Sequence, residues 1–335
     1  MQYNDSVYGA IDIEESVLLQ LMDSNAMQRL KGISQHGITA LIGITPPFSR
    51  FDHSVGAMLL VRQLGASLEE QIAALLHDIS HTAFSHVIDF VYDDQNGQSY
   101  HEDKKEQFVS DSDIPKILKQ YGRNWIDYMD ESKFELLEQD SPALCADRLD
   151  YFLRDLDFLR LANSNEIRTA VGALEVRDGK IVVNHPAVAG WMAYTFIETD
   201  RASWSNFREV GLYQLTAEAI KIAFNLGVID ESDIWSSDDQ LWQKLYSATH
   251  PDIKQYVNLI TPGTRFIWDD ENPLFRVATK IRSIDPPVSR GDKVMPLSEI
   301  DTTFGRYRQD YLSGKQGLWP MGVVGAFANS IKQSY

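Results

Sequence analysis

Cysteine is almost absent from this chain. Cys145 is the only one among 335 residues, so no intrachain disulfide can form, which suits a reducing compartment. No apolar run approaches the roughly 18–20 residues that cross a bilayer, and the first residues, MQYNDSVYG, lack the basic and apolar regions of a signal peptide. We therefore expect a cytoplasmic protein without membrane association.

Basic residues are scarce as well. The 31 Lys and Arg residues are outnumbered by 48 Asp and Glu residues, which gives a formal net charge of −17. Nucleic acids and membrane surfaces are polyanions, so we expect no stable binding to either of them. A small phosphorylated substrate remains compatible with this charge, because a local cluster of Arg and His reverses the field inside a pocket.

Apolar residues at helical spacing dominate the first half of the chain. Ser67 precedes Glu70 by three residues, which is the spacing of a capping box at a helix start. Ser141 and Pro142 are residue types typical of a cap and a first helical turn. The predicted helices cover residues 14–33, about 51–64, 67–79 and 141–161.

The second half of the chain mixes strands with helices. Two short alternating runs flank Asp178–Gly179, a pair favoured in tight turns, so we predict a hairpin over 173–184. Helical patterning continues over 187–227 and 238–248. The β-branched runs that follow residue 262 favour a small sheet.

The stretch LLHDISHTAFSH (75–86) places polar residues where a buried helix is expected. A buried aspartate and imidazole need partners, and a metal ion would supply one. His53 begins the preceding helix, and Asp147 lies on the polar face of a later one. With His77 and Asp78 they form a set of two imidazoles and two carboxylates, suited to one divalent Mn, Fe, Co, Ni, Mg or Zn ion. The His–Asp dipeptide alone is equally typical of a core histidine held by an aspartate.

Further histidines surround this stretch. His81 lies one helical turn after His77, and Asp89 follows His86 at a spacing suited to orienting its imidazole. His101 opens another predicted helix. Each of these histidines alone is typical of a surface or capping position, but together with His53 and His77 they bring five of the chain's eight histidines to one region. That density favours a shared pocket.

Six ordered segments resemble the HD-domain metal-dependent phosphohydrolases. The likeness is greatest to the branch that contains the bacterial dGTPase-like enzymes and the vertebrate sterile-alpha-motif/HD triphosphohydrolase. The segments are YNDSVYGAIDI (3–13), QRLKGISQHG (28–37), SRFDHSVG (49–56), LLHDISHTAFSHVID (75–89), SYHE (99–102) and ADRLDYFLRD (146–155). The resemblance implies a mainly α fold: an HD-domain helical core over 1–165, and a small β-hairpin with a mixed α/β C-terminal portion over 166–335 that packs on it.

The resemblance also implies roles for individual residues. The implied metal ligands are His53, His77, Asp78 and Asp147. The residues implied around the phosphate chain, which we predict to be catalytic, are His81, His86, Asp89 and His101. The implied substrate contacts are Arg50, Arg148 and Tyr151 for phosphate and Gln35 for the sugar or base. His86, oriented by Asp89, is our candidate acid for the leaving oxygen.

Two departures from the triphosphohydrolases concern the substrate. Their substrate-gripping helix corresponds here to WMAYTFIETDRASWSNFREVGLY (191–213), in which Arg201 and Arg208 have a different spacing. Lys31 and His36 stand where those enzymes often have a second Arg and a Leu. The relatives commonly assemble, so a homo-oligomer is compatible with the resemblance, but we match no region that would carry their nucleotide-controlled tetramer.

These observations predict a metal-dependent phosphohydrolase acting on a small nucleotide, with a (deoxy)nucleoside triphosphate as the first expectation. Water activated by the metal would attack phosphorus. Three alternatives remain open. They are a phosphatase for nucleoside monophosphates or other phosphoesters, a di-iron oxygenase with His81, His86 and His101 as extra ligands, and a nucleotide sensor without turnover.

Overall fold

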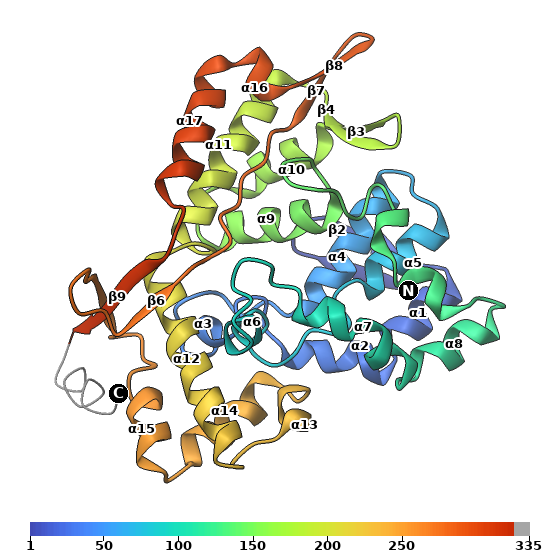
Figure 1. The fold of residues 1–335 in the computed structure, drawn as a ribbon. Coiled ribbons are helices and arrows are strands. Elements are labelled where there is room, and N and C mark those ends of the chain that lie inside the picture. Colours follow the sequence, from blue (N-terminus) through green and yellow to red (C-terminus); the bar gives the residue numbers. More distant parts are fainter. Residues whose placement is uncertain (325–335) are drawn as a thin grey trace.

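The structure, a computed structural model, describes residues 1–324 and is mainly helical, as predicted (Figure 1). The α-helices are α1 (Ser16–Met22), α2 (Asn25–Arg29), α3 (Ile38–Leu41), α4 (Arg50–Gln63), α5 (Leu68–Leu76), α6 (Val87–Val91), α7 (Tyr100–Ser110), α8 (Ile114–Gln120), α9 (Ala146–Phe158), α10 (Ser164–Gly172), α11 (Pro186–Ala202), α12 (Phe207–Asn225), α13 (Glu231–Ile234), α14 (Asp238–Ser247), α15 (Pro251–Val257), α16 (Leu297–Ile300) and α17 (Thr302–Gly314). The strands are β1 (Gln2–Asp5), β2 (Gly9–Asp12), β3 (Leu174–Arg177), β4 (Lys180–Val183), β5 (Arg265–Trp268), β6 (Phe275–Val277), β7 (Pro287–Arg290), β8 (Lys293–Pro296) and β9 (Trp319–Val324). Short 3-10 helices are η1 (Leu30–Gly32), η2 (Trp125–Tyr128) and η3 (Glu131–Lys133).

Side-chain caps start the two helices that lead into the polar stretch. Ser49 and Asp52 form a capping box at α4. Ser67 accepts a hydrogen bond from the Glu70 N–H and so caps α5, as predicted. The predicted return bond from Glu70 to Ser67 was wrong, because Glu70 Oε1 instead accepts from the N–H groups of Leu136 and its neighbour. Glu70 thereby ties α5 to a segment more than sixty residues away.

The predicted helix over 14–33 is broken in the structure. It divides into α1, α2 and η1, with the first break at Asp23–Ser24. The Ser24 hydroxyl donates to the carbonyl of Leu21 and accepts from the N–H of Met27. Such side-chain bonds compete with the helical backbone ladder, so Ser24 ends one helix and caps the next.

The predicted start of the helix over 141–161 was also wrong. α9 begins at Ala146, so Ser141 and Pro142 lie outside it. The N–H groups of Ala146 and Asp147 donate to the carbonyls of Leu136 and Leu137. A turn ten residues earlier in the chain therefore satisfies the first donors of α9, a contact that no helical or capping pattern reveals.

Three small sheets accompany the helices. β3 and β4 form the predicted hairpin, and both Asp178 and Gly179 in its turn have positive φ. β7 and β8 extend it to a four-stranded sheet in the order β3-β4-β7-β8. The predicted C-terminal sheet is also present, but β5 and β6 are separated by β9, which pairs with both.

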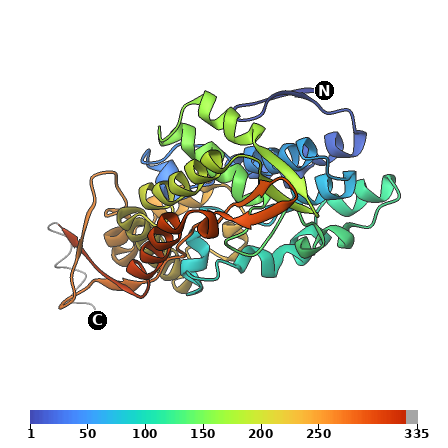
Figure 2. The same ribbon diagram turned by 90° about the horizontal axis from the view of Figure 1, so that it is seen from above.

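Two apolar clusters form the core. The larger one includes Leu60 of α4, Phe152 of α9 and Phe196 of α11, so it draws residues from both sides of position 165. The second includes Phe90 of α6 and Ile220 of α12. The chain between β6 and β7 crosses the molecule from the three-stranded to the four-stranded sheet (Figures 1 and 2). The boundary at 165/166 stays a prediction. Within residues 1–324 we find no helix with the length and apolar character needed to span a membrane.

Candidate metal and phosphate site

A cavity of about 500 Å³ gathers most of the predicted site residues. Those that line it are Gln35, Arg50, His77, Asp78, His81, His86, His101, Asp147, Arg148 and Tyr151. His53 and Asp89 lie behind this lining, each hydrogen-bonded to a residue of the wall. Residues separated by more than a hundred positions thus meet in one place, as the predicted shared pocket requires.

Four side chains converge at one end of the cavity. Nε2 of His53 lies 2.9 Å from Oδ1 of Asp147 and 3.1 Å from Nε2 of His77. One carboxylate oxygen of Asp78 lies 3.6 Å from Nε2 of His53, and the other lies 3.6 Å from Nε2 of His77. The four groups come from α4, from the end of α5 and from α9. We call them the His–Asp cluster.

The far sides of the two imidazoles fix their protonation. Nδ1 of His53 lies 2.7 Å from a carboxylate oxygen of Asp150, and Nδ1 of His77 lies 2.7 Å from the carbonyl oxygen of Ala74. Each Nδ1 therefore carries the hydrogen. The two Nε2 atoms then point at the same small space, so either a proton or a bound cation must lie between them and the carboxylates.

Without a bound cation, the carboxylates of the His–Asp cluster favour protonated imidazoles. Burial opposes a charge on His77, but the carboxylates of Asp78 and Asp147 outweigh burial and raise the pKa of His77 to about 10. Burial likewise opposes ionisation of Asp147, yet hydrogen bonds from His53 and His77 hold its pKa well below the ordinary value. Imidazole and carboxylate donors of this kind fit a divalent ion of borderline hardness.

Asp78 links the His–Asp cluster to the rest of the pocket. Its Oδ2 accepts from Arg50 Nη1 at 2.7 Å, and its Oδ1 lies 3.2 Å from Nε2 of His81. Arg50 Nε donates to the hydroxyl of Ser85 at 3.0 Å. The remaining nitrogen, Arg50 Nη2, is buried and has no hydrogen-bond partner among the described residues. A phosphoryl oxygen is the acceptor that such a guanidinium group suits.

Three histidines pack together beside Asp78. The ring of His81 stacks on that of His101 with centroids 3.8 Å apart, and the ring of His86 stands edge-on to both. Nδ1 of His86 lies 2.9 Å from Oδ2 of Asp89. Burial lowers the pKa of all three imidazoles, that of His81 to about 3. The three rings are therefore neutral near pH 7 in this structure.

The residues predicted to contact the substrate differ in whether their side chains already bond to other parts of the protein. Arg148 lines the cavity, but Nη1 donates to the carbonyl of Ala143 at 2.6 Å and Nη2 to the carbonyl of Gln139 at 3.1 Å. Its role in phosphate binding stays a prediction. Tyr151 stands edge-on to Trp204 with centroids 4.9 Å apart, which gives the cavity an aromatic wall.

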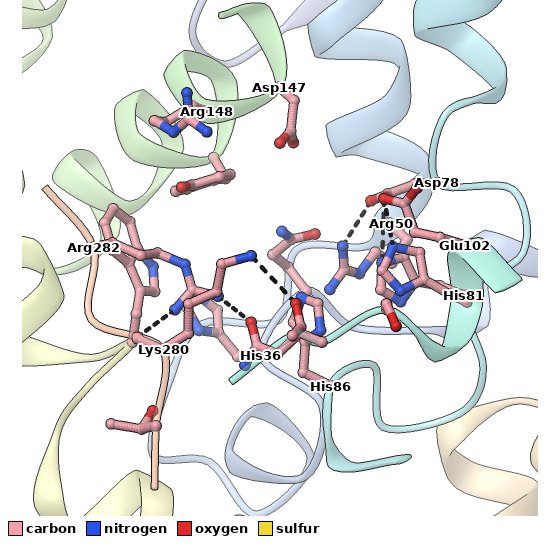
Figure 3. Close-up of a pocket in the computed structure, with 18 of the residues that line it drawn as sticks. His36, Arg50, Asp78, His81, His86, Glu102, Asp147, Arg148, Lys280 and Arg282 are labelled. Atoms are coloured by element: carbon pink, nitrogen blue, oxygen red, sulfur yellow. Dashed lines mark hydrogen bonds and ion pairs between the residues drawn. The ribbon is translucent and has the colours of Figure 1, made fainter. Parts of the chain in front are cut away.

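Sequence reasoning missed two basic residues of the pocket. Lys280 and Arg282 lie on the connection between β6 and β7, and Figure 3 shows Lys280 reaching into the cavity. Arg282 donates to the side chain of Gln98, while Nζ of Lys280 is 3.5 Å from the carbonyl of Gly97. The i, i+2 spacing of the two basic residues places them on one side of an extended chain, which is the only local signal for them.

Comparison with known proteins identifies the family. Residues 50–155 match the family model described as the HD domain. A metal-dependent phosphohydrolase of Cordyceps militaris is 37% identical over 318 residues, which cover 92% of this chain and 91% of that protein. The chain belongs to the HD-domain metal-dependent phosphohydrolases. This HD phosphohydrolase is therefore a metal-dependent hydrolase.

Two more distant likenesses concern fold and substrate. A phosphohydrolase of Bacteroides thetaiotaomicron has a crystal structure that superposes with a TM-score of 0.68 at 17% identity, covering 96% of this chain and 98% of that one. This match shows a shared fold. A deoxynucleoside triphosphate triphosphohydrolase of Gallus gallus is 26% identical over 220 residues, or 50% of this chain and 36% of that protein.

The described residues offer more than one place for a metal ion in this HD phosphohydrolase. His53, His77 and Asp147 bring three ligand atoms within 4.8 Å of one another, and so do Asp78, His81 and His101. Asp78 stands between these groups, because its two oxygens face His53 and Arg50 on one side and His77 and His81 on the other.

Proposed function

We propose that this HD phosphohydrolase hydrolyses a nucleotide, with a (deoxy)nucleoside triphosphate as the first candidate. The observation that carries the proposal is the composition of one pocket. It joins the His–Asp cluster to the cationic side chains of Arg50, Lys280 and Arg282 and to the aromatic wall of Tyr151 and Trp204. A phosphate chain requires the first two features, and a nucleoside suits the third. The partial likeness to a deoxynucleoside triphosphate triphosphohydrolase supports the triphosphate.

We assign the residues of the His–Asp cluster, His53, His77, Asp78 and Asp147, as the ligands of one divalent ion. The convergence of Nε2 of His53 and Nε2 of His77, 3.1 Å apart, beside the carboxylates supports this assignment. Mn, Fe, Co, Ni, Mg and Zn all remain compatible with the donor set. When bound, such an ion polarises a phosphoryl oxygen and makes water a stronger nucleophile near neutral pH.

The protein's own groups then act on the phosphate. Arg50 donates from its free Nη2 to a phosphoryl oxygen and balances the charge that grows there in the transition state. His81 and His101 contact the phosphate chain from the opposite wall. His86, oriented by Asp89, gives a proton to the leaving oxygen. Burial lowers the pKa of free His86, and the negative charge of a bound phosphate beside it raises that pKa, so the proton enters with the substrate.

A phosphate-release panel tests this proposal. Deoxynucleoside triphosphates, ribonucleoside triphosphates and nucleoside monophosphates are each incubated with Mn, Mg, Co, Ni or Fe, and the products are identified by mass spectrometry. We expect metal-dependent release of inorganic triphosphate or phosphate from at least one nucleotide class. Tight nucleotide binding without release under any metal would contradict hydrolysis and favour the nucleotide sensor.

A nucleoside monophosphate is the second candidate, and the charge of the pocket favours it. The cavity is lined by seven carboxylates but only four Lys and Arg residues. The carboxylates are Asp78, Glu102, Asp103, Glu131, Glu138, Asp147 and Glu209. A lining of this kind repels the four negative charges of a triphosphate more than the two of a monophosphate. The same panel decides between them by the mass of the released product.

A two-metal site is the third candidate. Asp78, His81 and His101 form a second set of ligand atoms next to the His–Asp cluster. Because the chain belongs to the metal-dependent phosphohydrolases, this candidate is a hydrolase with two metal ions, in place of the di-iron oxygenase considered from the sequence. Two metal ions per chain with phosphate release would support it, whereas one metal ion per chain with phosphate release would exclude it.

A further inference from the structure

Glu209 is a buried carboxylate in the wall of the same pocket. It lies in the first turn of α12 and is only 6% exposed. Oε2 accepts hydrogen bonds from the hydroxyls of Ser203 at 3.1 Å and Thr39 at 3.3 Å. Oε1 has no hydrogen-bond partner among the described residues, although the side chain lines the cavity. The carboxylate is thus held by one oxygen while the other is free.

No cation of the described residues forms an ion pair with Glu209. The charge that acts on it most strongly is that of His36, whose Nε2 lies 2.7 Å from Asp155 and whose Nδ1 lies 3.4 Å from the hydroxyl oxygen of Ser203. Burial raises the pKa of Glu209 to about 7. A buried carboxylate that accepts hydrogen bonds only from hydroxyl groups, and that the charge of His36 offsets only in part, is costly for the fold. A ligand that donates to the free oxygen would reduce this cost.

The surroundings of Glu209 indicate which part of a ligand reaches it. Gln35 Oε1 is also buried without a hydrogen-bond partner among the described residues and belongs to the same cavity. His36, which follows Gln35 in the chain, lies on the side of the pocket away from Asp147 (Figure 3). Arg50 beside the His–Asp cluster attracts phosphate, whereas the carboxylate of Glu209 repels it, so the phosphate lies toward Arg50 and the leaving group lies toward Glu209.

We propose that Glu209 determines substrate specificity by accepting a hydrogen bond from the leaving group, either from an amino N–H of a nucleobase or from a sugar hydroxyl. This inference rests on the proposed nucleotide hydrolysis and names the feature of the nucleotide that is read. A buried acceptor discriminates strongly against a ligand that lacks the donor, because the acceptor is then left desolvated and unpaired.

The test compares substrates that differ by one donor. The substrates are phosphate esters of adenosine, 2′-deoxyadenosine, inosine and purine riboside. Each carries the number of phosphates that gives the highest activity in the phosphate-release panel. Purine riboside lacks the amino group, and 2′-deoxyadenosine lacks one hydroxyl. Inosine replaces the amino group with a carbonyl and carries an N1–H donor instead. The variants are Glu209→Gln and, as a matched control, Glu218→Gln. Glu218 lies on the same helix outside the lining of the pocket. p-Nitrophenyl phosphate, which has no nucleoside, reports general activity.

In the unmodified chain, we expect kcat/KM to fall about tenfold or more for the analogue that lacks the recognised donor. In Glu209→Gln, the kcat/KM values for the substrates with and without the recognised donor should agree within about twofold. Its rate of p-nitrophenyl phosphate hydrolysis should change by less than about threefold. Glu218→Gln should match the unmodified chain on all substrates.

Two results would overturn the inference while leaving nucleotide hydrolysis intact. One is a Glu209→Gln variant with unchanged ratios across the panel. The other is an equal loss on p-nitrophenyl phosphate and nucleotides, which would indicate a structural role for Glu209. Failure of the proposed function gives a different pattern, in which the unmodified chain hydrolyses p-nitrophenyl phosphate but no nucleotide at all.

Discussion

Nδ1 of His53 lies 2.7 Å from Oδ2 of Asp150, on the opposite edge of the ring from Asp147. Asp150 Oδ2 also accepts from Arg154 Nε at 2.8 Å, and Arg154 Nη2 donates to Asp5 at 2.8 Å. A buried chain of charges therefore runs from the N-terminal strand β1 to the His–Asp cluster. It sets the tautomer and the ring orientation of His53 in advance of metal binding.

Replacing Asp150 should weaken the metal site without removing a ligand. We expect Asp150→Asn to lower metal affinity by about 10–100-fold, because the imidazole of His53 loses its orienting acceptor. Metal titration checks the affinity, and circular dichroism checks the fold. Asp157→Asn, at an exposed position of the same helix, is the control and should bind metal normally. Equal affinity in the two variants would contradict the role given to Asp150.

Removing a proposed ligand should have a larger effect than removing its support. We expect His77→Ala and Asp78→Ala each to lose bound metal and to reduce turnover by about 10³-fold or more. Elemental analysis of the purified variants measures the metal, and phosphate release measures the rate. Full activity of a metal-free Asp78→Ala variant would rule out the proposed mechanism.

His86 should behave differently from the ligands. It lies beside the phosphate region, and Asp89 orients it, so His86→Ala should keep the metal but lose about 10²–10⁴-fold in rate. The comparison uses metal content and kcat measured on the same preparation. Loss of metal from this variant would instead place His86 among the ligands and favour the two-metal candidate.

The part of the site that local sequence predicts is the part carried by helix starts and close spacings. His77, Asp78 and His81 follow α5 directly, and His53 lies in the first turn of α4, whose caps are local. Asp147 was added from its place on the polar face of a later helix, and the family resemblance implied the same set of four. The expected helix face shared by His77 and His81 was wrong, because α5 ends at Leu76 and a turn carries the residues that follow. The roles assigned to these side chains stay predictions.

The remaining features depend on contacts between distant segments. α9 begins where the carbonyls of Leu136 and Leu137 meet its first donors, not where Pro142 would start it. Lys280 enters the pocket because the connection between β6 and β7 crosses it. Glu209 is one acidic residue among many on an acidic chain, and only the packing of α12 against the pocket distinguishes it. No periodicity or motif in the sequence encodes these encounters.

Lys280 provides a test of the pocket that does not touch the metal. Burial lowers the pKa of Lys280, and the neighbouring charge of Arg282 adds to this effect, so an anionic substrate would satisfy a cation that its surroundings disfavour. We expect Lys280→Gln to raise KM about tenfold with a smaller change in kcat and with normal metal content. Lys293→Gln, at an exposed position of β8, is the control. An unchanged KM would show that the phosphate binds elsewhere.

Glu209 should also make stability depend on pH. Its pKa in the folded chain is raised to about 7 by burial, from an ordinary value of 4.5. The folded state therefore holds the proton more tightly than the unfolded state, so the stability present below about pH 4.5 is lost as the pH rises toward 7. Glu209→Gln removes this loss. We expect its Tm to match that of the unmodified chain near pH 4.5 and to exceed it by roughly 2–5 °C at pH 8. Differential scanning fluorimetry across this range, with Glu218→Gln as the control, measures the difference, and a Tm difference that did not change with pH would refute the buried, uncompensated charge.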